Sequence, residues 1–249
     1  PLGLGAGAVD AGLNGYVAEH YQARHMSWLH CFWGIGALTG PLIMSQLIAG
    51  DQSWRSGYLI VAIIQLVLAV VLFFSLPLWS QTSSPPKDEF SNPQAGKRGP
   101  RGIFFPLKIH GVKYALITFL FYCGIETTVG LWGSSYLVRD RGLDAAAAAV
   151  WVSSYYGSIT LGRLIAGFIT FKINNKVLIR IGQGLILTGV VLMFLPFSAG
   201  YALFSFILIG LGAAPIFPSM LHETPARFGQ EDAQHVMGFQ MAAAYIGST

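Results

Sequence analysis

The chain has 249 residues, of which 53% are hydrophobic and only 10% are charged, and its net charge at pH 7 is +4. Soluble domains carry roughly a quarter charged residues, so this composition excludes an ordinary soluble domain. The charged residues are also unevenly spread, because residues 25–50 and 56–86 contain no Asp, Glu, Lys or Arg. Repeated long stretches of this kind indicate a protein that crosses a membrane several times.

Each charge-poor stretch can house one or two apolar helices of about 20 residues, the length that crosses the hydrocarbon of a bilayer. Helices are expected because a backbone in lipid must satisfy its own hydrogen bonds. The chain begins and stops inside apolar segments, so we expect both outer spans to be truncated. The expected spans are 1–18, 26–49, 57–79, 112–138, 146–171, 177–197, 201–221 and 234 onward.

The loops between these spans alternate between two sides of the membrane, and one side holds most of the basic residues. Twelve Lys and Arg residues lie on that side and three on the other. Positive residues concentrate on the cytoplasmic side, so the richer set is expected to face the cytoplasm. That set is Arg24, Lys87, Lys97, Arg98, Arg101, Lys108, Lys113, Arg163, Lys172, Lys176, Arg180 and Arg227, and the other is Arg55, Arg139 and Arg141.

Residues 81–110 form the longest polar segment, rich in Pro, Ser, Gly and Lys, which is typical of a flexible linker. Its basic residues could alternatively bind anionic lipid headgroups. Similar Gly-rich sequences lie on either side of it, LGLGAGAVDAGLNGYV at 2–17 and IGLGAAPIFPSM at 209–220. Two related halves around a central loop indicate a transporter built from parallel repeats. We therefore expect residues 1–80 and 111–249 to belong to two helical bundles joined by a cytoplasmic linker.

Ionisable residues inside the spans are candidate functional residues, because a charge near the bilayer centre costs about 2.5–3.5 kcal/mol and rarely faces lipid. Asp10 and Asn14 are four residues apart and share one face of a helix. A carboxyl group removed from water binds a proton more readily, which suits Asp10 to coupling transport to a cation. The alternative is a structural hydrogen bond to a neighbouring helix.

Glu126 lies near the middle of its span, on a face with Gly130 and Gly133 that a ligand or another helix could approach. Its carboxylate could accept two sugar hydroxyls or hold Na⁺. His30 could donate to a substrate hydroxyl or bond a neighbouring helix.

Aromatic side chains supply a further set of candidates, because a flat ring can stack on the apolar face of a sugar. Packing or an interfacial belt explains such residues equally well. The candidates are Trp132, Trp151, Tyr155 and Tyr156.

Three segments resemble the major facilitator superfamily: SWRSGY at 53–58, LGRLIAGF at 161–168 and GLGAAPIFPSM at 210–220. The resemblance implies an all-α membrane protein containing about eight of that family's twelve helices, numbers 4 to 11, without helices 1–3 and 12. LGRLIAGF resembles the family's cytoplasmic loop motif, which implies a gating role for Gly162, Arg163 and Gly167. The acidic residue that usually follows this motif is missing here.

Within the superfamily, the chain is most similar to the fucose–galactose–glucose:cation symporters. The segments that carry this likeness are GAVDAGLNGY at 7–16, WLHCFWGIGALTGP at 28–41 and YCGIETTVGLWGSSY at 122–136. The likeness implies uptake of a hexose-type sugar with H⁺ or Na⁺ through alternating access, by a monomer in the bacterial inner membrane with no cofactor and no nucleic-acid partner. The likeness implies that Asp10 takes up the cation and that Asn14 contacts the sugar, and its motifs also include His30 and Glu126. With the candidates argued above from residue chemistry, the expected site is Asp10 and Glu126 for the cation, and Asn14, His30, Glu126, Trp132, Trp151 and Tyr155 for the substrate.

Three other functions compete with sugar uptake: efflux, membrane-embedded enzymatic activity, and sensing by a non-transporting protein of the same fold. GALTGP at 36–41 partly resembles a motif of drug:proton antiporters, so efflux of a drug or metabolite is the main alternative. A membrane enzyme would need clustered His, Asp or Glu, or a nucleophile beside a base, and the His residues here are scattered. We therefore expect a transporter and no enzymatic activity.

Overall fold

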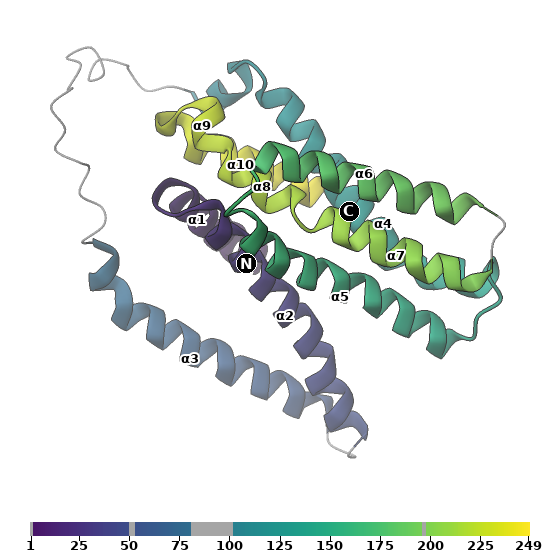
Figure 1. Cartoon of the computed structure of the whole chain (residues 1–249). Helices are drawn as coiled ribbons and strands as arrows, with labels where there is room; N and C mark the ends of the chain where they lie inside the picture. The colour runs from purple at the N-terminus through teal and green to yellow at the C-terminus, as the bar shows by residue number, and fades with distance from the viewer. Residues whose placement is uncertain (1, 50–52, 81–101, 196–197) are drawn as a thin grey trace, which may run out of the picture. The chain divides into compact units, whose positions relative to one another are not determined.

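The computed structural model describes residues 2–49, 53–80, 102–195 and 198–249. Within these ranges all regular structure is helical and no strand occurs, which confirms the expected all-α class. The helices are α1 (Leu2–His20), α2 (Ala23–Ala49), α3 (Trp54–Ser80), the short 3-10 helix η2 (Phe105–Lys108), α4 (Val112–Arg139), α5 (Ala145–Ile169), α6 (Asn175–Phe194), α7 (Ala199–Ala213), α8 (Ile216–His222), α9 (Thr224–Phe228) and α10 (Gln230–Gly247) (Figure 1).

Four described segments are long and apolar enough to cross a membrane by length and composition: Arg55–Leu78, Val112–Arg139, Asn175–Phe194 and Ala199–His222. The other expected spans also form helices, α1, α2, α5 and α10. The seventh expected span, 201–221, is not one continuous helix, because it divides into α7 and α8. Pro215 and Pro218 explain the division, since proline lacks the N–H that an α-helix requires.

The chain forms two compact units, one of residues 1–35 and 103–249 and the other of residues 36–102. The sequence predicts that the first bundle ends near residue 80. That division stays a prediction, because the two units are defined only by which helices of this chain contact one another. In the second unit, α3 exposes its Leu, Val and Phe side chains along its length. Such a surface suits lipid or further helices.

In the first unit, α7 packs between α5 and α6, and α4 contacts α5, α7 and α10. Helix α1 contacts α10 and α8, which brings the start of the chain against its C-terminal helices. Local capping fixes some helix ends: the Asn174 side chain accepts a hydrogen bond from the Val177 N–H at 3.0 Å at the start of α6. The core side chains Tyr155, Phe119 and Phe206 are fully buried among these helices.

The end of the expected linker is folded. Residues 81–101 lie outside the described residues, but η2 contacts α4 and α10, and the Phe104 ring lies 6.3 Å from the Phe239 ring. The linker expected at residues 81–101 lies outside the described residues and stays a prediction.

Candidate functional site

A cavity of about 280 Å³ lies inside the first unit. Its size falls near the lower end of ligand pockets, which hold about 300–1,000 Å³. The lining comes from α1 and α2 and from α4, α5, α8 and α10, so helices from both expected bundles build it. The lining residues are Asp10, His30, Trp33, Cys123, Glu126, Thr127, Tyr156, Arg163, Phe217, Met241, Ala244, Tyr245 and Ser248.

One part of the lining contains a chain of hydrogen bonds that includes both carboxylate oxygens of Asp10. The Asn14 amide Nδ2 donates to Asp10 Oδ1 at 3.3 Å, and the Tyr245 hydroxyl donates to Asp10 Oδ2 at 3.1 Å. His30 Nε2 lies 3.0 Å from Asn14 Oδ1. An amide oxygen only accepts, so His30 must carry its proton on Nε2 in this arrangement. Asn14 is 1% exposed, and its position between Asp10 and His30 fixes both side chains.

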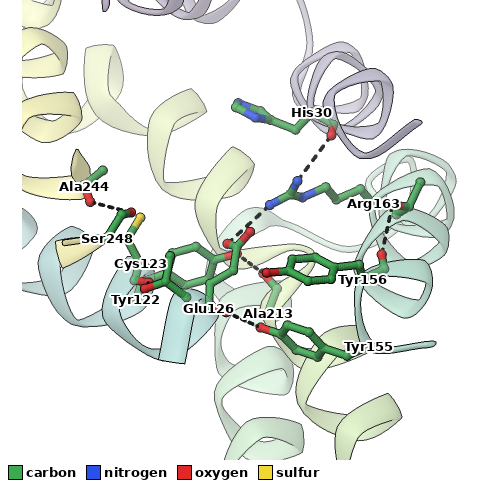
Figure 2. A network of polar contacts seen from close by, with 12 residues as sticks. His30, Tyr122, Cys123, Glu126, Tyr155, Tyr156, Arg163, Ala213, Ala244 and Ser248 are labelled. Carbon is green, nitrogen blue, oxygen red and sulfur yellow. Dashed lines mark hydrogen bonds and ion pairs between the residues drawn. The ribbon is translucent and has the colours of Figure 1, made fainter. Parts of the chain in front are cut away.

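A second part of the lining contains an ion pair. Arg163 Nη2 on α5 lies 3.6 Å from Glu126 Oε2 on α4, and the two side chains are only 4% and 13% exposed (Figure 2). The Arg163 guanidinium also lies 5.2 Å from the centre of the Trp33 ring, within cation–π range. Arg163 Nε is buried and has no hydrogen-bond partner among the described residues. The cavity therefore presents a desolvated donor beside a paired carboxylate.

His30 contacts both the Asp10–Asn14 hydrogen bonds and the Arg163–Glu126 ion pair. Its ring contacts Asn14, and its backbone carbonyl accepts a hydrogen bond from Arg163 Nη1 at 3.3 Å (Figure 2). The two carboxylates, on α1 and α4, are thus connected through one residue of α2.

Two tyrosine hydroxyls form hydrogen bonds that connect α4, the helix that carries Glu126, to its neighbours. The Tyr155 hydroxyl donates to the Glu126 backbone carbonyl at 3.3 Å (Figure 2). The Tyr122 hydroxyl donates to the Ala213 carbonyl at 3.0 Å, at the point where α7 ends. These bonds tie α4 to α5 and α7 around the cavity.

The structure places four of the predicted polar residues together, since Asp10, His30 and Glu126 line the cavity and Asn14 bridges the first two. Their roles in substrate and cation binding stay predictions.

Three of the four aromatic candidates lie outside this cavity, and their role in substrate binding stays a prediction. Trp132 is 67% exposed, Trp151 packs against the core, and Tyr155 is fully buried, and none of them lines the cavity. Helical spacing alone did not reveal which face each ring occupies. The fourth candidate, Tyr156, does line the cavity, together with Trp33, Phe217 and Tyr245.

The three residues of the predicted gating motif, Gly162, Arg163 and Gly167, have different surroundings. A Cβ added at Gly162 would collide with Ala214 on the C-terminal side of α7, so this glycine allows close packing within the C-terminal helices. A Cβ at Gly167 would collide with the Trp28 indole of α2. Arg163 lies six residues before the end of α5 and is 3% exposed. Arg163 therefore lines the cavity, and its gating role stays a prediction.

The comparisons with known proteins agree with this architecture. The family model of the Major Facilitator Superfamily matches residues 1–249, so the chain belongs to that superfamily. It is therefore part of a multi-pass membrane protein of a transporter family.

Three relatives show the range of functions in the family. The chain is 26% identical to the glucose/mannose transporter GlcP of Bacillus subtilis over 88% of its own length and 54% of the relative. It is 24% identical to the cis,cis-muconate transport protein of Acinetobacter baylyi, over 70% and 43%. It is 26% identical to bypass of stop codon protein 6 of Saccharomyces cerevisiae, over 68% and 37%. The chain thus spans about half or less of each relative, and no solved structure matches it significantly.

Proposed function

We propose that the protein takes up a hexose-type sugar together with a cation, H⁺ or Na⁺, across a bacterial inner membrane. The observation that carries this proposal is the cavity between helices of the two expected bundles, lined by both Asp10 and Glu126. Similarity to a glucose/mannose transporter supports a sugar as the substrate. No cofactor is needed for such transport, because the cation gradient supplies the free energy.

The lining suits a neutral molecule with many hydroxyls. A sugar hydroxyl can donate to the Asp10 or Glu126 carboxylate and accept from the buried Nε of Arg163. Burying a polar group requires such partners, because an unmade hydrogen bond is costly. The Trp33 and Tyr156 rings offer apolar surface to the C–H face of the sugar.

Asp10 is proposed to carry the coupling cation. Its Oδ2 accepts the Tyr245 hydroxyl of α10, so the carboxylate lies at a contact between the two expected bundles. A proton or Na⁺ on Asp10 changes this contact, which connects cation occupancy to the relative position of the bundles. An inward cation gains about 2.3 kcal/mol per 100 mV of membrane potential, which can drive accumulation.

Alternating access is supported by close contacts between the two bundles at residues expected near the cytoplasm. The His222 ring Nε2 lies 3.1 Å from the Tyr21 carbonyl, between the end of α8 and the α1–α2 turn. Small residues lie along the same interface, where an added Cβ would collide with the partner side chain. These pairs are Gly15 with Gln234, Gly34 with Thr160 and Gly167 with Trp28.

We infer that the described conformation is closed toward the cytoplasm, with its cavity reached from the outside. The inward-open state then requires these three glycine contacts to separate.

Replacing Gly167 by Leu is expected to shift the protein toward the inward-open state, because the larger side chain cannot fit against Trp28. Spin labels at the exposed positions Gln22 and Lys172 report the distance between the cytoplasmic ends. We expect a longer mean distance in Gly167→Leu. Gly157→Leu, on the same helix with open space around it, should keep the wild-type distance. Equal distances in both variants would show that this interface does not hold the closed state.

A second candidate substrate is an organic anion. Arg163 pairs with Glu126, and a substrate carboxylate could compete with Glu126 for the guanidinium. Similarity to a muconate transport protein favours this possibility.

Solute exchange without any ion gradient separates the two candidates. Liposomes carrying the protein, expressed from its complete reading frame, are loaded with unlabelled glucose or muconate and offered the labelled compound. Exchange of glucose but not muconate supports the sugar proposal. The reverse result supports the organic anion, and exchange of neither contradicts both substrate classes.

A further inference from the structure

A second cavity, of about 570 Å³, lies between α4, α6, α8, α9 and α10 and shares no lining residue with the first. Its polar lining is formed by Lys176, Arg180, Gln183, Glu223, Arg227 and Gln240. The charge distribution of the loops places this end of the helices in the cytoplasm. The proposed sugar transport does not use this cavity.

The cavity contains three cationic side chains, and only one carboxylate lines it. Lys176 and Arg180 are four residues apart on α6, so both charges lie on one face of the helix, where like charges repel. The Arg227 guanidinium lies 5.5 Å from the centre of the Phe228 ring. No ion pair joins any of the three cations to an acidic residue within the described part of the chain.

The single carboxylate is already engaged. Glu223 Oε1 accepts a hydrogen bond from Asn175 Nδ2 at 3.0 Å, and the same nitrogen lies 3.2 Å from the His222 ring. Glu223 therefore neutralises at most one of the three positive charges, and the cavity keeps an excess of positive charge.

A buried amide adds an unpaired donor. Gln240 is 1% exposed, and its Oε1 accepts from the Thr224 hydroxyl at 3.1 Å. Its Nε2 has no hydrogen-bond partner among the described residues and belongs to a side chain that lines the cavity. This nitrogen can therefore donate to an acceptor inside the cavity.

We propose that this cavity binds a phosphate group from the cytoplasmic side. A phosphate offers several acceptor oxygens and up to two negative charges, which match three cations and one amide donor. The phosphate can belong to an anionic lipid headgroup or to a soluble phosphorylated compound, and the chemistry of recognition is the same for both.

Inorganic phosphate and phosphatidylglycerol are the probes that test this site on the complete protein in detergent. The apparent melting temperature is measured with increasing phosphate, replaced by chloride at constant ionic strength. Retention of phosphatidylglycerol, relative to phosphatidylcholine, is measured by native mass spectrometry. We expect phosphate to raise the melting temperature, and a bound lipid to be displaced by phosphate if the lipid is the natural ligand.

Three variants make the result specific. Arg180→Gln combined with Arg227→Gln should abolish the phosphate-dependent rise, while Lys172→Gln, an exposed cation outside the cavity, should keep it. Glu223→Gln retains an acceptor for Asn175 but removes the negative charge, so it should lower the phosphate concentration needed for half of the effect.

The outcomes distinguish the sources of the phosphate. Preferential retention of phosphatidylglycerol, lost in the double variant, identifies a lipid headgroup. Stabilisation by phosphate without lipid preference identifies a soluble ligand. If neither probe distinguishes wild type from the double variant, or if Glu223→Gln binds phosphate no more tightly, the proposal is wrong.

Discussion

Replacing Arg163 by Met is expected to destabilise the protein by up to about 3–5 kcal/mol, because it leaves the Glu126 carboxylate, which is only 13% exposed, without its partner charge. The substitution also removes the hydrogen bond from Nη1 to the His30 carbonyl. The expected observation is a large fall in the apparent melting temperature of the purified protein and loss of transport.

The pair can be tested by a double-mutant cycle. Glu126→Gln combined with Arg163→Met removes both charges, so it should recover most of the stability that Arg163→Met alone loses. Recovery of stability without recovery of transport would show that the two charges serve function. If the double variant is as unstable as the single one, the ion pair does not account for the effect.

Replacing Asp10 by Asn is expected to abolish accumulation of substrate against its concentration gradient. The amide has nearly the shape of the carboxyl and can still accept the Tyr245 hydroxyl through its oxygen, but it cannot take up a proton at neutral pH. Exchange of labelled for unlabelled substrate, which needs no net cation movement, should persist.

Glu19→Gln is the matched control for Asp10→Asn, because Glu19 is an exposed carboxylate on the same helix. It should leave both exchange and accumulation unchanged. Gradient-driven accumulation that survives in Asp10→Asn would assign Asp10 a structural role.

The sequence was sufficient for the fold class because lipid imposes the same length and polarity on every helix that crosses it. It also brought attention to Asp10 and Glu126, since charges inside apolar spans are expensive and therefore few. Asn14 followed from its position one helical turn after Asp10.

The structure adds contacts that depend on which faces of separate helices meet. The pairing of Arg163 with Glu126 joins α4 to α5 and has no local sequence signal. The likeness of LGRLIAGF to a cytoplasmic loop motif instead predicted a gating role for Arg163 near the membrane surface. Trp132 and Trp151 were candidates by residue type alone, while Trp33 and Phe217 line the cavity because of how α2 and α8 pack. The sequence does contain a signal for the break before α8, namely Pro215 and Pro218. The predicted continuous span 201–221 did not take these prolines into account.

Labelled glucose uptake into liposomes under imposed ion gradients tests the central claim most directly. The complete protein is reconstituted, and an inward gradient of H⁺ or of Na⁺ is applied separately. We predict that one of the two gradients drives glucose above its outside concentration and that dissipating the gradient releases it. Glucose that only equilibrates under both gradients, or leaves the liposomes against its own gradient when the cation enters, would contradict cation-coupled uptake.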